Sequence, residues 1–312
     1  MEKIIAVIGA GLIGRAWAMV FARAGWRVRL NDRDSTQLGA AQAFIAASVD
    51  EQAGYGLVAD PEAALARIAY MPALEDALAG VDWVQENLPE TLETKREVFA
   101  ALDRHAPPEA VLASSTSAIP ASQFTETLPG RARCLVAHPV NPPHLVPVVE
   151  LCGAPWTSPS VIDRAKRVYS EVGQVPIIVN REIDGFILNR LQGALLSEAM
   201  RLVGEGYVSP EDLDKTVRDG LGLRWSFMGP LATIELNAPG GVADYCARYS
   251  GFYRRLAEAP PEASVWDAES AARVAAALGP PSSGKVLDAR THWRDQRLMA
   301  LARHKREQSE SN

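Results

Sequence analysis

The sequence is short of cysteine, has no excess of basic residues and contains no long apolar run, and each shortage excludes a class of protein. The three cysteines, Cys134, Cys152 and Cys246, lack the close spacing of a disulfide framework or a zinc site, so we expect no metal and a reducing cytoplasm. A formal net charge of -6 gives no basic surface for a nucleic acid or an anionic lipid. No run approaches the roughly 18 apolar residues of a membrane span. A small molecule is therefore the expected partner.

What remains is the composition of an ordinary globular protein. The 312 residues are 47% hydrophobic and 22% charged, which suffices to bury sizeable cores, and the length suits two domains. Short apolar runs alternate with helical patterns in the first part, as in a doubly wound parallel α/β sheet. From Asp184 on, apolar residues recur at helical spacing and no strand pattern follows. We predict an α/β domain over residues 1–183, an all-helical domain over 184–303 and a polar tail over 304–312.

The period of the apolar residues predicts the individual elements of the first domain. Residues 4–8 form a β-branched run that is hydrophobic on both faces, which is typical of a strand buried in a parallel sheet. A helical pattern and a second strand pattern follow, and together they make a βαβ unit. The other predicted elements are helices over residues 12–24 and 92–102 and strands over residues 26–30, 81–85, 111–114, 134–137 and 146–151.

Three glycines lie between the first predicted strand and the first predicted helix. Gly9, Gly11 and Gly14 allow a tight turn, a close approach of a pyrophosphate to the backbone, and close packing of the helix on the strand. Asp32 ends the second strand, where a carboxylate accepts hydrogen bonds from a ribose and repels the extra phosphate of NADP. Arg33 beside it is able to serve that phosphate, so NADP stays open. The pattern predicts a Rossmann-type domain that binds NAD.

A histidine and a glutamate follow in segments that otherwise read as buried strands. His138 stands at the end of an apolar run, where open α/β sheets bind ligands, and it is the best placed general base in the sequence. Glu150 lies in an apolar strand pattern and needs a partner such as an imidazole. A carboxylate that orients the imidazole suits hydride-transfer chemistry. The alternative is a core histidine with an edge-strand glutamate. Taken alone, Ser117 and Asn189 are more typical of capping or surface polar residues than of catalytic ones.

Together these motifs resemble the 3-hydroxyacyl-CoA dehydrogenase family from residue 4 to about residue 237. The resemblance implies a catalytic set of Ser117, His138, Glu150 and Asn189, with His138 as the general base and a homodimer as the assembly. It also implies contacts to NAD near the nicotinamide and its ribose, although the sequence SSTS at 114–117 replaces the Asn-Thr-Ser of the family. The predicted cofactor-binding residues are Gly9, Gly11, Leu12, Ile13, Gly14, Asp32, Glu86, Lys95, Ser115 and Asn141.

Within that family, the chain most resembles the lambda-crystallin branch, which oxidises the small 3-hydroxy acid L-gulonate. Arg224 stands where acyl-CoA enzymes have no arginine, and it is suited to pair with the carboxylate of a small acid. No Lys or Arg lies between Arg33 and Arg67, where acyl-CoA enzymes present basic residues to CoA. The alternatives are a 3-hydroxyacyl-CoA dehydrogenase, a carnitine 3-dehydrogenase, and a crystallin-like structural protein that keeps the dinucleotide fold without catalysis. Arg224 in a surface ion pair is the alternative for that residue.

Overall fold

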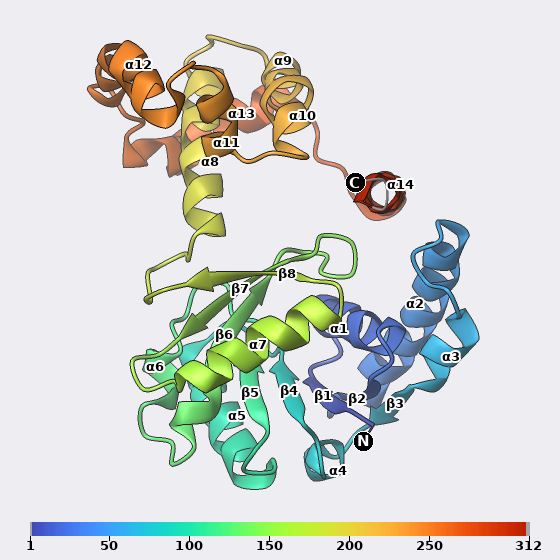
Figure 1. The fold of residues 1–312 in the computed structure, drawn as a ribbon. Helices are drawn as coiled ribbons and strands as arrows, with labels where there is room; N and C mark the ends of the chain where they lie inside the picture. Colours follow the sequence, from blue (N-terminus) through green and yellow to red (C-terminus); the bar gives the residue numbers. More distant parts are fainter. Residues whose placement is uncertain (1, 310–312) are drawn as a thin grey trace. The chain divides into compact units, whose positions relative to one another are not determined.

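The chain folds into two units, each with its own contacts. A computed structural model describes residues 2–309 (Figure 1). One unit comprises Met1–Asn189 together with Asp288–Asn312, and the other comprises Arg190–Leu287. We call them the sheet unit and the helical unit and describe each by itself.

Within residues 2–309, the sheet unit is built around eight strands. Their order is β3-β2-β1-β4-β5-β6-β7-β8, and every neighbouring pair is parallel except β6 and β7 (Figure 1). The central strands are buried on both faces, which explains their near-continuous apolar sequences. The strands are β1 Ile4–Ile8, β2 Arg27–Asn31, β3 Ile68–Met71, β4 Trp83–Glu86, β5 Val111–Ser114, β6 Cys134–Pro139, β7 Val148–Gly153 and β8 Val175–Val179.

Helices cover both faces of the sheet, and alternate residues of β1 divide between two apolar cores. In one core, Trp17 of α1 packs against Tyr169 of α7 with ring centroids 5.4 Å apart. In the other, Phe99 of α5 packs against Phe124 of α6 at 4.7 Å. The helices are α1 Leu12–Arg23, α2 Ser35–Gly54, α3 Pro61–Ala66, α4 Leu74–Leu78, α5 Leu92–His105, α6 Ser122–Thr125 and α7 Pro159–Glu171, with a 3-10 turn, η1, at Arg131–Arg133.

The predicted α/β fold with a helical C-terminal part is confirmed, and every predicted strand is present with ends shifted by up to two residues. The edge strands β3 and β8 were not predicted. β8 has the sequence VPIIV, in which a proline interrupts the strand pattern, and it lies at the edge where a missing amide donor is tolerated. The helix α2 was also missed, because its small and apolar residues are spread around the helix without one clear face.

The helical unit begins inside α8, whose first two residues still belong to the sheet unit. A π-helical turn, η2, immediately precedes the short helix that carries Arg224, and such turns are frequent at functional sites. Among residues 2–309, no helix is both long and apolar enough to cross a bilayer. The elements are α8 Leu188–Gly204, α9 Pro210–Lys215, η2 Thr216–Leu221, α10 Gly222–Trp225, α11 Pro230–Leu236, α12 Gly241–Ala257, the 3-10 turn η3 Ala263–Trp266 and α13 Ala268–Leu278.

The last helix, α14 (Gly284–Ser309), differs from the prediction, which gave residues 288–303 to the helical domain and 304–312 to a polar tail. From Asp288 on, this helix belongs to the sheet unit. Met299 is buried against Leu57 and Leu145, and the Arg306 guanidinium donates to the carbonyl oxygens of Gly56 and Leu57 at 3.1 and 3.3 Å. These contacts come from sequence-distant segments that helical periodicity does not report. Residues 310–312 lie outside the described part.

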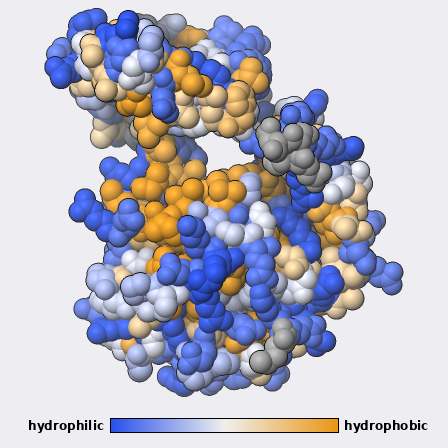
Figure 2. All heavy atoms as spheres, viewed as in Figure 1, coloured by the Kyte–Doolittle hydropathy of each residue, from blue (hydrophilic) through white to orange (hydrophobic). Residues whose placement is uncertain are grey.

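The edge of the sheet formed by β8 is hydrophobic and exposed. Figure 2 shows hydrophobic side chains gathered over β8. Val175, Ile177 and Ile178 remain 50%, 39% and 37% exposed there. An apolar sheet edge of this kind is a surface that a protein normally covers.

Candidate active site

The turn between β1 and α1 has the geometry of a phosphate-binding loop. Gly9 has φ +93°, a conformation that favours glycine, and a Cβ on Gly14 would lie 1.7 Å from the Gly9 carbonyl oxygen. A Cβ on Gly11, in contrast, would meet no atom within 4 Å. Gly11 is the N-cap of α1 and supplies no side chain to the first amides of the helix, so these amides can bind an anion. Two glycines shape the loop and one leaves room for the ligand.

Asp32 ties the end of β2 to this loop. Its Oδ2 accepts a hydrogen bond from the Ala10 amide at 3.0 Å, and its Oδ1 accepts one from the Asp34 amide at 3.0 Å. The Gly9 amide donates to the Asn31 carbonyl oxygen at 2.8 Å. A carboxylate held beside an open glycine turn and an uncapped helix N-terminus fits the adenosine ribose and the pyrophosphate of NAD. Arg33 is exposed next to it.

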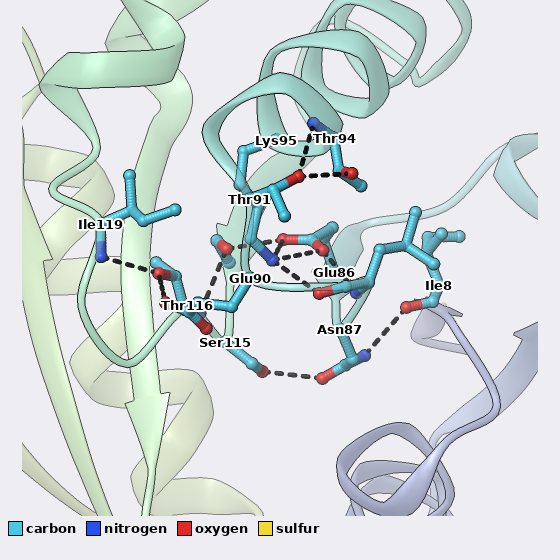
Figure 3. Close-up of polar contacts among 12 residues, drawn as sticks. Ile8, Glu86, Asn87, Glu90, Thr91, Thr94, Lys95, Ser115, Thr116 and Ile119 are labelled. Carbon is cyan, nitrogen blue, oxygen red and sulfur yellow. Dashed lines mark hydrogen bonds and ion pairs between the residues drawn. The ribbon is translucent and has the colours of Figure 1, made fainter. Parts of the chain in front are cut away.

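Glu86 and Lys95, both predicted to lie near the cofactor, form a buried ion pair (Figure 3). Lys95 Nζ donates to the two Glu86 oxygens at 2.8 and 3.0 Å and to the Leu88 carbonyl oxygen at 2.9 Å. Glu86 also accepts from the Ser114 hydroxyl at 2.6 Å and from the Leu88 amide at 2.5 Å. Both side chains are at most 1% exposed. In this arrangement the pair supports the loop after β4, and neither group is presented to a ligand.

Glu90, which the sequence reasoning missed, is the exposed carboxylate of the same region (Figure 3). It accepts hydrogen bonds from the amides of Ser117 and Ala118, both at 2.9 Å, and from the Thr116 hydroxyl. The carboxylate thereby fixes the loop after β5, which holds Ser117. Its place just before the N-cap Thr91 of α5, five residues ahead of Lys95, is the signal that could have identified it.

Ser115 replaces the asparagine of the family motif, and its hydroxyl is fully used inside the protein. It accepts from Trp17 Nε1 at 3.0 Å and from Gln85 Nε2 at 2.8 Å, and it donates to Asn87 Oδ1 at 2.7 Å. Asn87 in turn donates to the carbonyl oxygen of Ile8, at the start of the glycine turn, at 3.2 Å (Figure 3). Ser115 and Asn87 therefore link the loops after β4 and β5 to the glycine turn.

His138 and Glu150 face each other across the antiparallel pair β6 and β7. They are directly opposite in the register, and His138 Nδ1 lies 2.8 Å from Glu150 Oε2. The side chains are only 7% and 2% exposed. A carboxylate bound to Nδ1 fixes the ring so that Nε2 is the nitrogen that remains to accept a proton. The predicted general base and its orienting carboxylate therefore form a pair.

The second oxygen of Glu150 holds the start of α8. Oε1 accepts hydrogen bonds from the amides of Ile187 and Leu188 at 2.8 and 2.9 Å. Burial by itself would raise the pKa of Glu150, but the hydrogen bonds from His138, Leu188 and Ile187 outweigh it and hold that pKa below its usual value. The carboxylate is therefore ionised near neutral pH.

Asn189 and Ser117 come together beside this pair. Asn189 Nδ2 donates to the Ser117 carbonyl oxygen at 3.0 Å, and one of its two amide hydrogens remains for another acceptor. Phe186, fully buried with φ +47°, brings its ring to 5.7 Å from the His138 ring. Left-handed backbone at a bulky residue is strained and is found mainly at functional sites. Each residue of the predicted catalytic set thus contacts another member of that set.

Two of the predicted site residues, Asn141 and Arg224, take no part in the hydrogen bonds of the catalytic set. Asn141 is exposed in the loop between β6 and β7. Arg224 lies on α10 of the helical unit, where its side chain is exposed and makes no ion pair or hydrogen bond within residues 2–309. No group of three or more His, Cys, Asp or Glu side chains in that part of the chain is arranged to hold a metal ion.

Comparison with known proteins identifies the family. The model of the 3-hydroxyacyl-CoA dehydrogenase NAD binding domain matches residues 4–183, and the model of the C-terminal domain of that enzyme matches residues 185–272. The chain belongs to the 3-hydroxyacyl-CoA dehydrogenase family. This family member is therefore an NAD-dependent oxidoreductase that acts on a hydroxyl group, and the part that matches the NAD binding domain includes the glycine turn.

Among its relatives are proteins with different names. The chain is 45% identical over 309 residues to the lambda-crystallin homolog of Bos taurus, which covers 96% of this chain and 95% of the relative. It is 38% identical over 240 residues to the L-carnitine dehydrogenase of Streptomyces griseus, covering 77% and 71%. The solved structure of an NAD-dependent 5-formyl-3-hydroxy-2-methylpyridine 4-carboxylic acid 5-dehydrogenase superposes with a TM-score of 0.83 at 27% identity, covering 97% and 98%. The predicted lambda-crystallin likeness is confirmed.

Proposed function

We propose that this enzyme oxidises a small, free 3-hydroxy acid of the L-gulonate type to the 3-keto acid. The observation that carries the chemistry is the His138–Glu150 pair, in which a buried carboxylate is bonded to Nδ1 and leaves Nε2 for the substrate. NAD, when bound at the glycine turn, supplies the hydride acceptor. The substrate class rests on Arg224 and on the relatives.

In the proposed mechanism, His138 Nε2 accepts the proton of the substrate C3 hydroxyl as the hydride leaves C3. Glu150 stabilises the imidazolium that forms, because a carboxylate at 2.8 Å from Nδ1 favours the charged ring. The Ser117 hydroxyl and the remaining Asn189 amide hydrogen donate to the substrate oxygen as it gains carbonyl character. Glu90 and the Ser117 carbonyl oxygen hold these two donors in position.

Arg224 is proposed to bind the substrate carboxylate. A guanidinium pairs bidentately with a carboxylate, and Arg224 has no acidic partner within residues 2–309, which argues against the surface ion pair. Its neighbour Arg218, in contrast, pairs with Asp219 at 2.6 Å. Two of the relatives support a free acid, since their names state activity on L-carnitine and on a pyridine carboxylic acid.

The lack of basic residues on α2 disfavours a CoA thioester as the substrate. Residues 34–66, which include all of α2, contain no Lys or Arg. Acyl-CoA enzymes of the family present basic residues in this region, where they meet the phosphates of CoA. The 3-hydroxyacyl-CoA dehydrogenase activity is therefore the second candidate. Carnitine oxidation is the third, because Trp225 beside Arg224 does not by itself make a cage for a cationic ligand.

The test is NAD reduction with L-gulonate, L-carnitine, 3-hydroxybutyrate and 3-hydroxybutyryl-CoA. We expect a free acid to be the best substrate. Arg224→Met should raise the KM for this acid by at least about tenfold, because one charge-assisted contact to its carboxylate is lost. Arg218→Met, which removes the same charge nearby, should leave KM unchanged. A preference for the thioester, or an equal effect of the two variants, would contradict the proposed substrate class.

His138→Ala tests the chemistry separately from the substrate. We expect it to remove most turnover while NAD affinity, measured by fluorescence titration, stays nearly intact. Unchanged turnover would refute the role of His138, and loss of both properties would indicate a structural role.

We further propose that the enzyme is a homodimer. Aromatic and aliphatic side chains of the helical unit are exposed to an extent that single surface residues do not explain, with Phe227, Leu231 and Leu236 at 74%, 71% and 73%. Light scattering after size exclusion should give twice the 33.7 kDa chain mass. A monomer at micromolar concentration would contradict the proposal.

The cytoplasm is the proposed site of action, because all three thiols are free, which is the state that a reducing compartment maintains. Cell fractionation followed by immunodetection tests this, and recovery in an oxidising compartment would contradict it.

A further inference from the structure

A cavity of about 570 Å³ lies inside the sheet unit, beneath α14. Its walls come from the end of α1, the loop between β6 and β7, the start of β8 and the second half of α14. The volume is in the range of small-molecule sites. None of the residues proposed above for catalysis or for NAD binding lines it.

Positive charge gathers on one side of this cavity. Arg23 of α1 and Arg306 of α14 both line it and are close enough for Arg306 to lower the pKa of Arg23, although burial is the larger cause of the shift to about 10. Arg23 Nη1 donates to Gln52 Oε1 at 3.1 Å and to the His144 carbonyl oxygen at 2.8 Å. Arg306 donates to the carbonyl oxygens of Gly56 and Leu57. Within residues 2–309, neither guanidinium has a carboxylate in ion-pair distance, so two neighbouring charges are balanced only by dipoles.

His144 adds a buried nitrogen without a partner. His144 is one of the residues that line the cavity and is 7% exposed, and its Nδ1 is buried with no hydrogen-bond partner among the described residues. Burial first, and then the charges of Arg23, Arg15 and Arg294, lower the pKa of His144 to about 3. The ring is therefore neutral near pH 7. The ring therefore brings no charge to balance the two guanidiniums, which are costly without an anionic partner unless a ligand anion binds to them.

The rest of the wall is apolar. Hydrophobic side chains from four segments face the cavity, and an inorganic ion would leave most of this surface without contact. They belong to Leu57, Leu145, Val146, Val175, Leu298 and Leu301.

We propose that this cavity is a second ligand site, which takes an amphipathic anion: an organic acid with a carboxylate or phosphate head at Arg23 and Arg306 and an apolar body against the leucines and valines. The head neutralises the two guanidiniums, and the body replaces water along α14. The site is separate from the substrate site, but one wall is the loop 140–147, which connects β6 with His138 to β7 with Glu150.

Octanoate is the probe, titrated by calorimetry into the full-length enzyme saturated with NAD. We expect one site per chain, and Arg306→Met should weaken binding at least about tenfold, the effect of losing one charge-assisted hydrogen bond. Arg303→Met, on the same helix but outside the cavity wall, is the matched control and should bind as the wild type does. Because Arg306 is exposed and near the end of the chain, its replacement should not prevent folding.

Three further titrations test whether octanoate binds in the cavity through both its head and its body. Octan-1-ol and inorganic phosphate, which have only the body or only the head, should each bind at least about tenfold more weakly than octanoate. Equal binding of either one overturns the proposal. So does equal weakening by Arg306→Met and Arg303→Met. In the third titration, octanoate is added to Arg224→Met; if binding is lost there and kept in Arg306→Met, the probe occupies the substrate site and the cavity is not its site.

Discussion

The substitution Glu150→Gln should lower kcat by about 10³- to 10⁴-fold while NAD still binds. The reason is the three hydrogen bonds of this carboxylate: one to His138 Nδ1 and two from the amides of Ile187 and Leu188. Glutamine has the same shape but only one acceptor oxygen, so it cannot satisfy both sides. In hydrolases with a carboxylate–histidine pair, the corresponding change lowers kcat about 10⁴-fold.

The two orientations of the glutamine amide differ in cost. With its oxygen toward the α8 amides, the NH₂ group faces His138 Nδ1, and the ring must place its proton on Nε2, where it can no longer act as a base. With its oxygen toward His138, the NH₂ group faces two backbone donors, and each unsatisfied amide costs about 1–3 kcal/mol. The first orientation is therefore favoured by about 2–6 kcal/mol, and the inactive tautomer dominates.

The assay is steady-state kinetics on the best substrate, with NAD affinity and the thermal melting temperature measured on the same samples. Glu171→Gln is the control, because it removes an exposed carboxylate paired with Lys3 and should change kcat less than about twofold. A Glu150→Gln enzyme that melts like the wild type and keeps kcat within about threefold would refute the tautomer reasoning.

Three other predictions concern the glycine turn, the Lys95–Glu86 ion pair and His144. Gly14→Ala should destabilise the enzyme by about 3 kcal/mol, because its Cβ would meet the Gly9 carbonyl oxygen. Gly11→Ala should keep the melting temperature of the wild type, because its Cβ meets no protein atom, but should lose NAD affinity. Calorimetry measures both quantities. Lys95→Met should cost about 3–5 kcal/mol in urea unfolding, since it leaves a buried carboxylate unpaired, and normal stability would contradict the ion pair. Below about pH 6.5 the unfolded chain protonates His144, whereas the folded chain does so only near pH 3. The free energy of unfolding of the wild type should therefore decrease more than that of His144→Phe as the pH is lowered from about 6.5 to about 3. Parallel curves for the two proteins would contradict this.

Local patterns in the sequence predicted the fold well, because they report which residues face a core. The strand runs at 4–8 and 111–114 are apolar on both faces and are central strands, and Gly14 is confined by the carbonyl oxygen of Gly9, only five residues away. The edge strands have weaker patterns because one side faces solvent. The ends of strands differ by a residue or two since hydrogen-bond partners decide them.

The site was predictable where a motif fixed both residue type and position, and not where distant segments meet. The spacing of His138 and Glu150 suggested a pair, and the structure shows it, but nothing near Glu150 announced that it binds the amides of α8. Glu86 is a carboxylate in the expected place, yet its bonds are internal, and Glu90 is the exposed one. Periodicity also could not show that α14 returns to the sheet unit, since its partners, such as Leu57, are far away in the sequence.

The one reversal of strand direction in this sheet explains how the pair forms. Two neighbouring parallel strands are joined by a long crossover, so residues that face each other at their carboxyl ends are far apart in the sequence. β6 and β7 are antiparallel and joined by one loop, so His138 and Glu150 stand opposite each other although they are only twelve residues apart. A shift of register by one residue would turn Glu150 to the other face of the sheet. The same carboxylate holds the first turn of α8, so the element that leads into the helical unit is attached to the group that orients the base. In the proposed mechanism the chemistry is therefore built into the sheet, whereas Arg224, the proposed carboxylate ligand, belongs to another unit, so we expect its replacement to change substrate preference without disturbing the His138–Glu150 pair.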